Sequence, residues 1–218
     1  MEKNFEIRFG KLIEEMISSG WLKTPKIINA FKFIKRIDFL PEDKKQLAFY
    51  NEALPIGYGQ TISQPVVVAF MLELLKPKEG EKILDIGAGS GWTSSLLSYC
   101  VGEKGKVIAI ERIPQLKEFA EKNSKKYNFI KKGILKIIKG DGTKGFIKEA
   151  PFDKIICGAA VQRKEDLPVA WKEQLKVGGK IVTPIYHSIF LIEKRSEKDF
   201  DFKEYPGFLF VPLIPDES

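Results

Sequence analysis

Residues 82–92, KILDIGAGSGW, decide the fold of this chain. A short apolar strand, KILDI, runs directly into a loop that contains three glycines, Gly87, Gly89 and Gly91. Glycine lets the backbone turn sharply and lets its N–H groups approach a ligand closely. The helix expected from Trp92 onward would present the partial positive charge of its first turn to the same place. The stretch therefore predicts a nucleotide-type cofactor at the carboxyl end of a strand.

Acidic residues at the ends of three expected strands indicate which cofactor. The glycines are spaced G-x-G-x-G, whereas the dinucleotide fingerprint is G-x-G-x-x-G. Asp85 directly precedes the loop, Glu111 closes the next strand, and Asp141 stands in a Gly-Asp-Gly turn after the third. Glu111 can accept from both hydroxyls of a ribose, and Asp141 is placed to accept from an adenine amino group. This arrangement fits S-adenosylmethionine, whose amino-acid end is cationic. The alternative is a tight turn bordered by surface acids.

Outward from this stretch, apolar strands alternate with amphipathic helices. We expect helices at 66–75, 92–102, 115–127 and 167–175, strands at 82–86, 106–112, 134–141, 152–160 and 178–185, and antiparallel strands at 187–196 and 200–213. Such alternation predicts parallel strands, right-handed crossovers and helices on both faces of the sheet. The fold class is therefore α/β, with a doubly wound and mostly parallel sheet.

The N-terminal part of the chain is predicted to be mostly helical. Apolar residues, beginning with Phe5, recur at helical spacing over residues 3–18. A second helix is expected over 25–35, because Pro25 stands at its start and proline is favoured at the first helical position. A short third helix is expected over 42–49.

Length and composition are those of a globular protein. The chain has 218 residues, of which 44% are hydrophobic and 30% charged, enough for one domain with a buried core. We expect that domain to consist of a helical extension (1–60), a cofactor-binding core (61–185) and C-terminal strands (186–218). No membrane span and no signal peptide are predicted, so cytoplasmic residence is the expectation.

Few residues are available for metal or nucleophilic chemistry. Cys100 and Cys157 are far apart, and His187 is the only histidine. This removes the usual basis for a zinc site or a histidine-dependent triad, and we predict no metal. The net charge of +7 could indicate an RNA partner, but the lysines are spread along the chain and predict a solvated surface instead. We expect a monomer without a membrane or nucleic-acid partner.

A polar segment, LPIGYGQTISQP at 54–65, precedes an apolar helix. Gly57 and Gly59 would let it pass close to a ligand. Thr61 and Ser63 fall on one face if the segment is extended, since strand side chains alternate. Two interpretations remain open: Ser63 orients a substrate under a lid, or Ser63 caps the helix that follows.

Several segments in order resemble one protein family. They are LPIGYGQTISQP, DIGAGSGW, IER, GDG, APFDKIICGAA, QLKVGGKIVTPI and FVPL, spread over roughly residues 30 to 213. Together they resemble the protein-L-isoaspartate O-methyltransferases, which are class I methyltransferases with a Rossmann-like sheet. The resemblance implies methyl transfer from S-adenosylmethionine to the α-carboxylate of L-isoaspartyl residues in damaged proteins and peptides. The ester then collapses to a succinimide, which allows repair.

The residues and the resemblance together predict the site. The resemblance assigns the catalytic position to Ser63, which would orient the isoaspartyl carboxylate. Substrate-positioning roles are expected for Gln60, Thr61, Val211 and Pro212. The expected cofactor-binding residues are Asp85, Gly87, Ala88, Gly89, Gly91, Glu111, Arg112, Asp141 and Gly142.

The chain also departs from the family pattern in places that concern substrate preference. These are residues 66–68, 92–95 and 161–168. Two other functions stay open: an RNA methyltransferase with the same cofactor fold, and a cofactor-binding module without activity. The sequence CGAA at 157–160 stands where an RNA base methyltransferase usually has N-P-P-Y or D-P-P-Y, which argues against the first.

Overall fold

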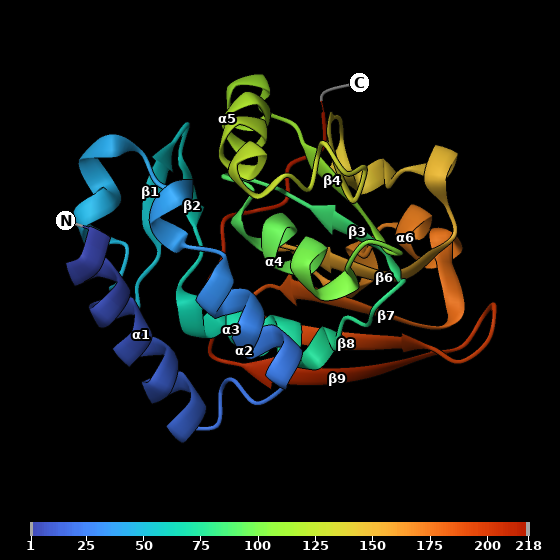
Figure 1. Cartoon of the computed structure of the whole chain (residues 1–218). Coiled ribbons are helices and arrows are strands. Elements are labelled where there is room, and N and C mark those ends of the chain that lie inside the picture. The colour runs from blue at the N-terminus through green and yellow to red at the C-terminus, as the bar shows by residue number, and fades with distance from the viewer. Residues whose placement is uncertain (1, 217–218) are drawn as a thin grey trace.

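A seven-stranded sheet runs through the protein in the order β5-β4-β3-β6-β7-β8-β9 (Figure 1). The computed structural model describes residues 2–216, with side chains from residue 6 onward. The ends of the expected domain at 1 and 217–218, and the side chain of Phe5, lie outside the described residues. The strands are β3 Lys82–Ile86, β4 Lys106–Glu111, β5 Leu135–Lys139, β6 Phe152–Cys157, β7 Leu175–Ile185, β8 Ser188–Lys194 and β9 Phe200–Pro206.

The topology confirms the predicted fold class. Strands β3 to β7 pair in parallel, whereas β8 and β9 add antiparallel pairs at one edge. The inner strand β3 has β4 on one side and β6 on the other. The chain therefore reverses its direction of winding beside β3, and the crevice at the carboxyl ends there is where such sheets bind ligands.

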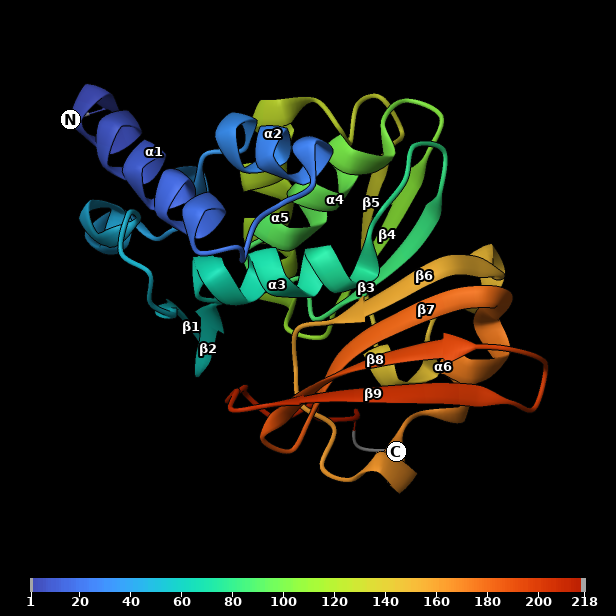
Figure 2. The ribbon, with the colours of Figure 1, turned by 90° about the horizontal axis from the view of Figure 1, so that it is seen from below.

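Helices cover both faces of the sheet (Figure 2). The α-helices are α1 Glu2–Ser18, α2 Pro25–Phe33, α3 Pro65–Leu75, α4 Trp92–Val101, α5 Pro114–Ser124 and α6 Val169–Gln174. Alternate strand residues feed two separate cores, because neighbouring side chains point to opposite faces. Ile83 joins the core beneath α1 to α5, whereas Leu84 joins the core that contains Trp171 of α6.

The N-terminal extension packs into the first of these cores. Phe31 of α2 is fully buried and meets the Trp92 ring edge-on, with the ring centroids 5.6 Å apart. The expected helix over 42–49 is instead a 3-10 helix, η2 Glu42–Leu47, preceded by another, η1 Arg36–Phe39. Both 3-10 helices lead the chain toward the carboxyl ends of the strands.

The segment 54–65 folds into a hairpin rather than an open loop. Strands β1 Leu54–Gly57 and β2 Gln60–Ile62 pair antiparallel. Tyr58 and Gly59 form the turn with φ of 55° and 69°, so both lie in the left-handed region that a tight hairpin turn of this type requires. The lid expected from the sequence is thus a short flap with its own backbone pairing.

The final antiparallel strand is shorter than predicted. It ends at Pro206, and Gly207, with φ of 96°, turns the chain back toward the carboxyl ends of the sheet. There the N–H of Ala160 donates to the carbonyl of Val211 at 2.7 Å, and the N–H of Leu213 donates to the carbonyl of Ala160 at 2.8 Å. The expectation of one strand over 200–213 was wrong, since proline and glycine interrupt the ladder.

The remaining short elements join the strands. They are the 3-10 helices η3 Lys125–Tyr127, η4 Gly142–Lys144, η5 Ile147–Glu149 and η6 Lys164–Asp166. Across residues 2–216, none of the helices has both the length and the apolar character that a membrane span needs.

Candidate active site

The glycine loop after β3 lies at the predicted position but uses its N–H groups internally. Those of Gly87 and Ala88 donate to the carbonyl of Ile110, and that of Gly91 donates to the carbonyl of Ala88. The N–H of Gly89 donates to the Glu111 carboxylate at 2.8 Å. The glycines therefore contribute positive-φ turns, at 79°, 54° and 87° in chain order, rather than free donors.

Two cavities meet at this loop. The inner cavity runs from the loop to the end of the flap and is lined by Ser63, Asp85 and Trp92, among others. The strand-end cavity lies over the next strands and is lined by Glu111 and Arg112, among others. Both share Thr61, Gly87, Gly89 and Gly158. Together they form one continuous site along the carboxyl edge of the sheet.

Asp85 brings a carboxylate into the inner cavity, and no cationic side chain within residues 6–216 forms an ion pair with it. It is 2% exposed, and Ser94 of α4 donates its hydroxyl hydrogen to Oδ2 at 2.6 Å. Burial, opposed by the Ser94 hydrogen bond and assisted by the charge of Glu111, raises the pKa of Asp85 to about 6. A buried carboxylate without a cationic partner is costly. The inner cavity is therefore suited to a ligand that carries a positive charge at this end.

Glu111 lies at the end of β4 and is held by backbone donors. Its Oε2 accepts from the N–H of Gly89 at 2.8 Å, and its Oε1 accepts from the N–H of Ile113 at 2.9 Å. Each carboxylate oxygen can accept a second hydrogen bond. The carboxylate thus has a fixed orientation and spare acceptor capacity at the strand-end cavity, as a pair of ribose hydroxyls would require.

Asp141 lies beside the strand-end cavity but already has local partners. Its Oδ1 accepts from the N–H and the hydroxyl of Thr143, at 2.9 and 2.7 Å, so it caps η4. Burial raises the pKa of Asp141, but hydrogen bonds from Thr143 and Asp216 and the charge of Lys144 outweigh burial and lower it. Gly142 lines the cavity itself. The carboxylate therefore stays ionised, with Oδ1 bonded to Thr143 and Oδ2 lying 3.7 Å from Nζ of Lys144.

Arg112 connects the strand-end cavity to the C-terminal segment. Its Nε lies 3.6 Å from the carboxylate of Asp216. Val211, Pro212 and Ile214 of the same segment line the cavity. The C-terminal segment of residues 211–216, called the chain end below, therefore crosses the carboxyl ends of β4 and β6. Local sequence patterns do not reveal this placement.

Gly91 has a packing role in this structure. It lines neither cavity, and a Cβ at this position would lie 2.9 Å from the Ser124 hydroxyl and 3.1 Å from atoms of Ala120. The missing side chain therefore allows α4 to begin against α5. Of the three predicted loop glycines, only Gly87 and Gly89 face the cavities.

Ser63 lies between the flap and α3 with its hydroxyl available. Among the described residues, no hydrogen bond to its hydroxyl is found, and α3 has Gln64, not Ser63, at its N-cap. The N–H of Val66 is instead satisfied by Oδ1 of Asn51 at 3.0 Å. The helix-cap interpretation of Ser63 was therefore wrong, because a residue distant in the chain supplies the cap.

Ser63 and Thr61 also line an outer groove. This groove contacts the chain end at Val211 and passes Gly158, which borders the inner cavity as well. Gln60 points elsewhere: it lines the strand-end cavity, and its side-chain amide donates weakly to the carbonyl of Tyr58 at 3.4 Å. The two hydroxyl residues thus stand where an outer, open groove reaches the inner cavity.

The sequence analysis missed some contributors to the site. Ser94 fixes the Asp85 carboxylate, and Asn51 caps the helix behind Ser63. Arg36 donates to the carbonyl of Ser63. Ser94 could have been predicted as a site residue, because it is the third residue of the helix that follows the glycine loop. No local pattern indicates a role for Asn51 or Arg36.

Nearly the whole chain matches known proteins of one kind. Residues 8–218 match the model of the family Protein-L-isoaspartate(D-aspartate) O-methyltransferase (PCMT). The protein-L-isoaspartate O-methyltransferase of Methanopyrus kandleri is 39% identical over 221 residues, covering 100% of this chain and 96% of the relative. That of Thermococcus onnurineus is 40% identical, covering 93% of this chain and 91% of the relative.

A solved structure shares the fold. It is a Plasmodium falciparum chain assigned to the same enzyme class and solved with S-adenosyl-L-homocysteine. Its TM-score is 0.80 at 23% identity, with 94% of this chain and 97% of that chain covered. The family match extends over nearly all of the chain and supports the leading interpretation rather than the RNA methyltransferase alternative. This chain belongs to the protein-L-isoaspartate(D-aspartate) O-methyltransferase family.

Proposed function

We propose that this protein methylates the α-carboxylate of L-isoaspartyl residues in damaged proteins and peptides, with S-adenosylmethionine as the methyl donor. Family membership supports the reaction. One observation carries the assignment of the site: Thr61 and Ser63 line both the inner cavity, with Asp85, and the outer groove. Donor and acceptor can therefore meet at a pair of hydroxyl residues.

The residues present fit S-adenosylmethionine. Asp85, buried without a cationic partner, would hold the ammonium of the amino-acid end. Glu111 would accept from the ribose hydroxyls, and Asp141 with Gly142 would border the adenine. Gly87 leaves open space where a Cβ would stand, with no atom within 4 Å, so the ligand can pass close to the backbone there.

The reaction makes modest chemical demands on the protein. When bound, S-adenosylmethionine supplies a methyl group whose carbon–sulfur bond breaks as the carboxylate oxygen bonds to the carbon. A carboxyl group has a pKa near 4 and is already ionised at neutral pH, so no residue has to remove a proton. The protein has to align the carboxylate and exclude water.

Neutral donors suit this task. A hydroxyl can orient a carboxylate oxygen without stabilising its charge so strongly that it loses reactivity. Ser63 would donate to the isoaspartyl carboxylate, and Thr61 and Gln60 of the flap would shape the site around it. Val211 and Pro212 would contact the peptide along the outer groove and the chain end.

A direct assay tests the reaction. Purified protein is incubated with labelled S-adenosylmethionine and matched peptides that contain either aspartate or isoaspartate, and base-labile methyl ester is counted. We expect label on the isoaspartyl peptide only. Label on RNA, or tight cofactor binding without transfer to any acceptor, would overturn the proposal in favour of one of the two alternatives.

Ser63→Ala tests the proposed catalytic residue. We expect kcat for the isoaspartyl peptide to fall by about 100-fold, as when one oriented hydrogen-bond donor is removed from an active site. The Kd of S-adenosylhomocysteine, measured by calorimetry, should stay nearly unchanged because Ser63 lies at the acceptor side. Ser19→Ala, in an exposed position after α1, is the matched control, and kcat equal to wild type in Ser63→Ala would contradict the role.

We also propose that the protein is a cytoplasmic monomer. Both cysteines, Cys100 and Cys157, are free and buried, which suits a reducing compartment. The state of assembly is tested by light scattering after gel filtration, where a mass near 24.8 kDa is expected.

A further inference from the structure

Arg36 is a buried cation that contacts the backbone near the proposed catalytic serine. It begins η1 and is 0% exposed. Its Nη1 donates to the carbonyls of Ala48 and Tyr50 at 3.2 and 3.0 Å. Its Nη2 donates to the carbonyls of Glu52 and Ser63 at 2.6 and 3.2 Å. One guanidinium therefore joins the segment 48–52 to the residue that follows the flap.

This cation has no counter-charge among the side chains of residues 6–216. In the part of the chain with described side chains, no carboxylate forms an ion pair with Arg36, and its Nε has no hydrogen-bond partner. Burial lowers its pKa to about 9, and its guanidinium carbon lies 5.4 Å from the centre of the Trp92 ring. Burying an ion without a counter-ion is energetically costly. Stability alone therefore does not account well for a guanidinium here.

Arg36 donates to the carbonyl of Ser63, a backbone group that neither the flap nor α3 uses in its own hydrogen bonds. Helix α3 starts at Pro65, and its first carbonyl acceptor is that of Gln64, which receives the N–H groups of Val67 and Val68. The carbonyl of Ser63 thus lies outside the helix. On the other side, Ile62 still pairs with the first strand of the flap. Arg36 therefore fixes the Ser63 carbonyl, which lies between hairpin and helix.

Arg36 reaches the same place by a second route. It holds the carbonyls of Tyr50 and Glu52, the two neighbours of Asn51. The Asn51 side chain in turn accepts from the N–H of Val66 at 3.0 Å, within the first turn of α3. Both sides of Ser63 are then tied to a single charged group whose planar fork has donors in fixed directions.

We propose that Arg36 is a positioning residue for methyl transfer, which holds the Ser63 backbone so that the hydroxyl faces the junction of the inner cavity and the outer groove. The proposal rests on the proposed function of Ser63. Arg36 acts only through Ser63 and has no contact with the acceptor. A small displacement of a positioning group is enough to slow a reaction by two orders of magnitude.

The test combines four variants: Arg36→Lys, Arg36→Met, Ser63→Ala and the double variant Arg36→Lys with Ser63→Ala. We expect kcat for an isoaspartyl peptide to fall about 10- to 100-fold in Arg36→Lys, because lysine keeps the charge but lacks the fork. The Kd of S-adenosylhomocysteine should change by less than about twofold. In the double variant, kcat should equal that of Ser63→Ala alone, since coupled residues are not additive.

A matched control separates positioning from general loosening. Lys194 is another buried cation, 1% exposed, and donates to the carbonyls of Lys172 and Leu175 at 3.0 and 2.9 Å, far from the site; unlike Arg36 it also pairs with a carboxylate, that of Glu197 at 2.8 Å. Lys194→Met should lower the unfolding temperature while kcat, measured where the protein is folded, stays at the wild-type value. If Arg36→Met does not fold, the kcat of Arg36→Lys alone tests whether Arg36 positions Ser63.

Three results would overturn the inference. The first is wild-type kcat in Arg36→Lys. The second is a double variant whose loss is the product of the single losses, which would mean that Arg36 acts independently of Ser63. The third is an equal loss of kcat in Lys194→Met at equal loss of stability. If Ser63→Ala alone leaves kcat unchanged, the proposed role of Ser63 is wrong, and the positioning role of Arg36 that depends on it is wrong as well. This outcome differs from the three above, in which Ser63 keeps its role and Arg36 loses its own.

Discussion

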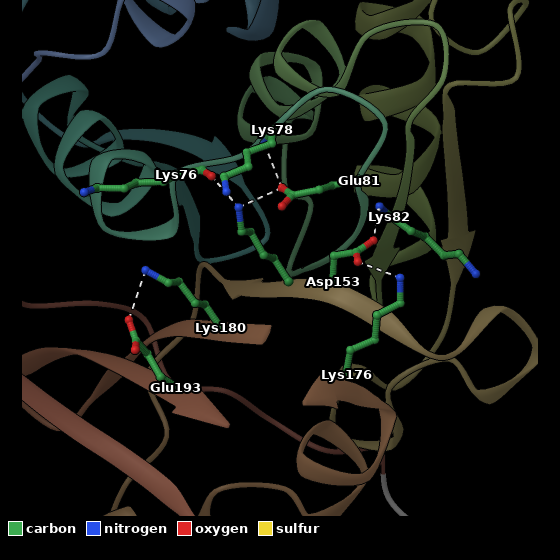
Figure 3. Close-up of polar contacts among 9 residues, drawn as sticks. Lys76, Lys78, Glu81, Lys82, Asp153, Lys176, Lys180 and Glu193 are labelled. Carbon is green, nitrogen blue, oxygen red and sulfur yellow. Dashed lines mark hydrogen bonds and ion pairs between the residues drawn. The ribbon is translucent and has the colours of Figure 1, made fainter. Parts of the chain in front are cut away.

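The two ends of the parallel sheet carry similar charged residues in opposite states. At the amino end, acids and lysines are paired (Figure 3): Asp153 with Lys176 at 2.6 Å and Glu193 with Lys180 at 3.0 Å. At the carboxyl end, by contrast, the described partners of Asp85 and Glu111 are a hydroxyl and backbone N–H groups.

This difference separates stability from function within one sheet. A carboxylate paired with lysine has its charge compensated inside the folded protein, whereas an unpaired buried carboxylate raises the free energy of the ligand-free protein. Such a group is retained where a ligand compensates it. The contrast therefore leads to four predictions, in which substitutions at the amino end change stability alone and substitutions at the carboxyl end change cofactor affinity.

The largest effect is expected at the most buried ion pair of the amino end. Lys154 is 7% exposed, lies 2.7 Å from Glu81 and also donates to the carbonyl of Lys76. Lys154→Met removes the ion pair of Glu81 and leaves its carboxylate bonded to the N–H of Lys78 at 2.7 Å, so the free energy of unfolding should fall by about 3–5 kcal/mol. Urea unfolding measures it. An accompanying loss of affinity for S-adenosylhomocysteine would contradict the separation of the two ends.

At the carboxyl end, Asp85→Asn should raise stability and weaken cofactor binding. Because the pKa of Asp85 is raised to about 6 in the folded protein, the native state holds the extra proton between about pH 4 and 6. Stability of the ligand-free protein therefore falls as pH rises through that window. The neutral amide removes this loss, on the order of 2–3 kcal/mol at pH 7.

Two measurements check this prediction. Unfolding at pH 4.5 and pH 7 should show less pH dependence in Asp85→Asn than in the wild type. Calorimetry should show at least about tenfold weaker binding of S-adenosylmethionine at pH 7, because the ammonium loses its charged partner. In the wild type, affinity should fall as pH drops below about 6, where Asp85 becomes protonated. An affinity that does not vary with pH would contradict the role of this carboxylate.

Glu111→Gln should weaken cofactor binding. The substitution keeps the shape but removes the charge and one acceptor, and a hydrogen bond to a charged group contributes about 1.5–3 kcal/mol. The Kd of S-adenosylhomocysteine should therefore rise about 10- to 100-fold. S-adenosylhomocysteine lacks the sulfonium, so it isolates the ribose contact from charge at sulfur. An unchanged Kd would mean that Glu111 does not bind the ribose hydroxyls.

The smallest effect is expected at a half-buried pair of the amino end. Lys180 and Glu193 face each other across β7 and β8, and each side chain is 25% exposed. Lys180→Met should change the free energy of unfolding by no more than about 1 kcal/mol, since solvent and salt screen such pairs. Lys180→Met also serves as the control for Lys154→Met. If both variants lost the same free energy of unfolding, the burial of an ion pair would not determine how much it stabilises the protein.

Short-range patterns in the sequence were sufficient for the fold class and for the positions of the glycine loop and of Asp85 and Glu111 at the carboxyl ends of neighbouring strands. Glycines directly after an apolar strand, with Asp85 before them and Glu111 at the end of the next strand, predict where parallel strands bring their carboxyl ends together. This inference needs only the regular geometry of strands and crossovers. The prediction was less accurate where proline and glycine interrupt a pattern, as at Pro206 and Gly207, because strand periodicity does not show which neighbour the chain then pairs with.

Only the tertiary structure decided which groups surround Ser63. The sequence left open whether its hydroxyl caps a helix, and the answer depends on Asn51, which satisfies the N–H of Val66 instead. The contact of Arg36 with the carbonyl of Ser63 joins residues 27 positions apart through a fully buried side chain. Periodicity reports which face of an element is buried, whereas hydrogen-bond partners are set by the packing of distant segments, and for that reason the acceptor side of the site required the folded protein.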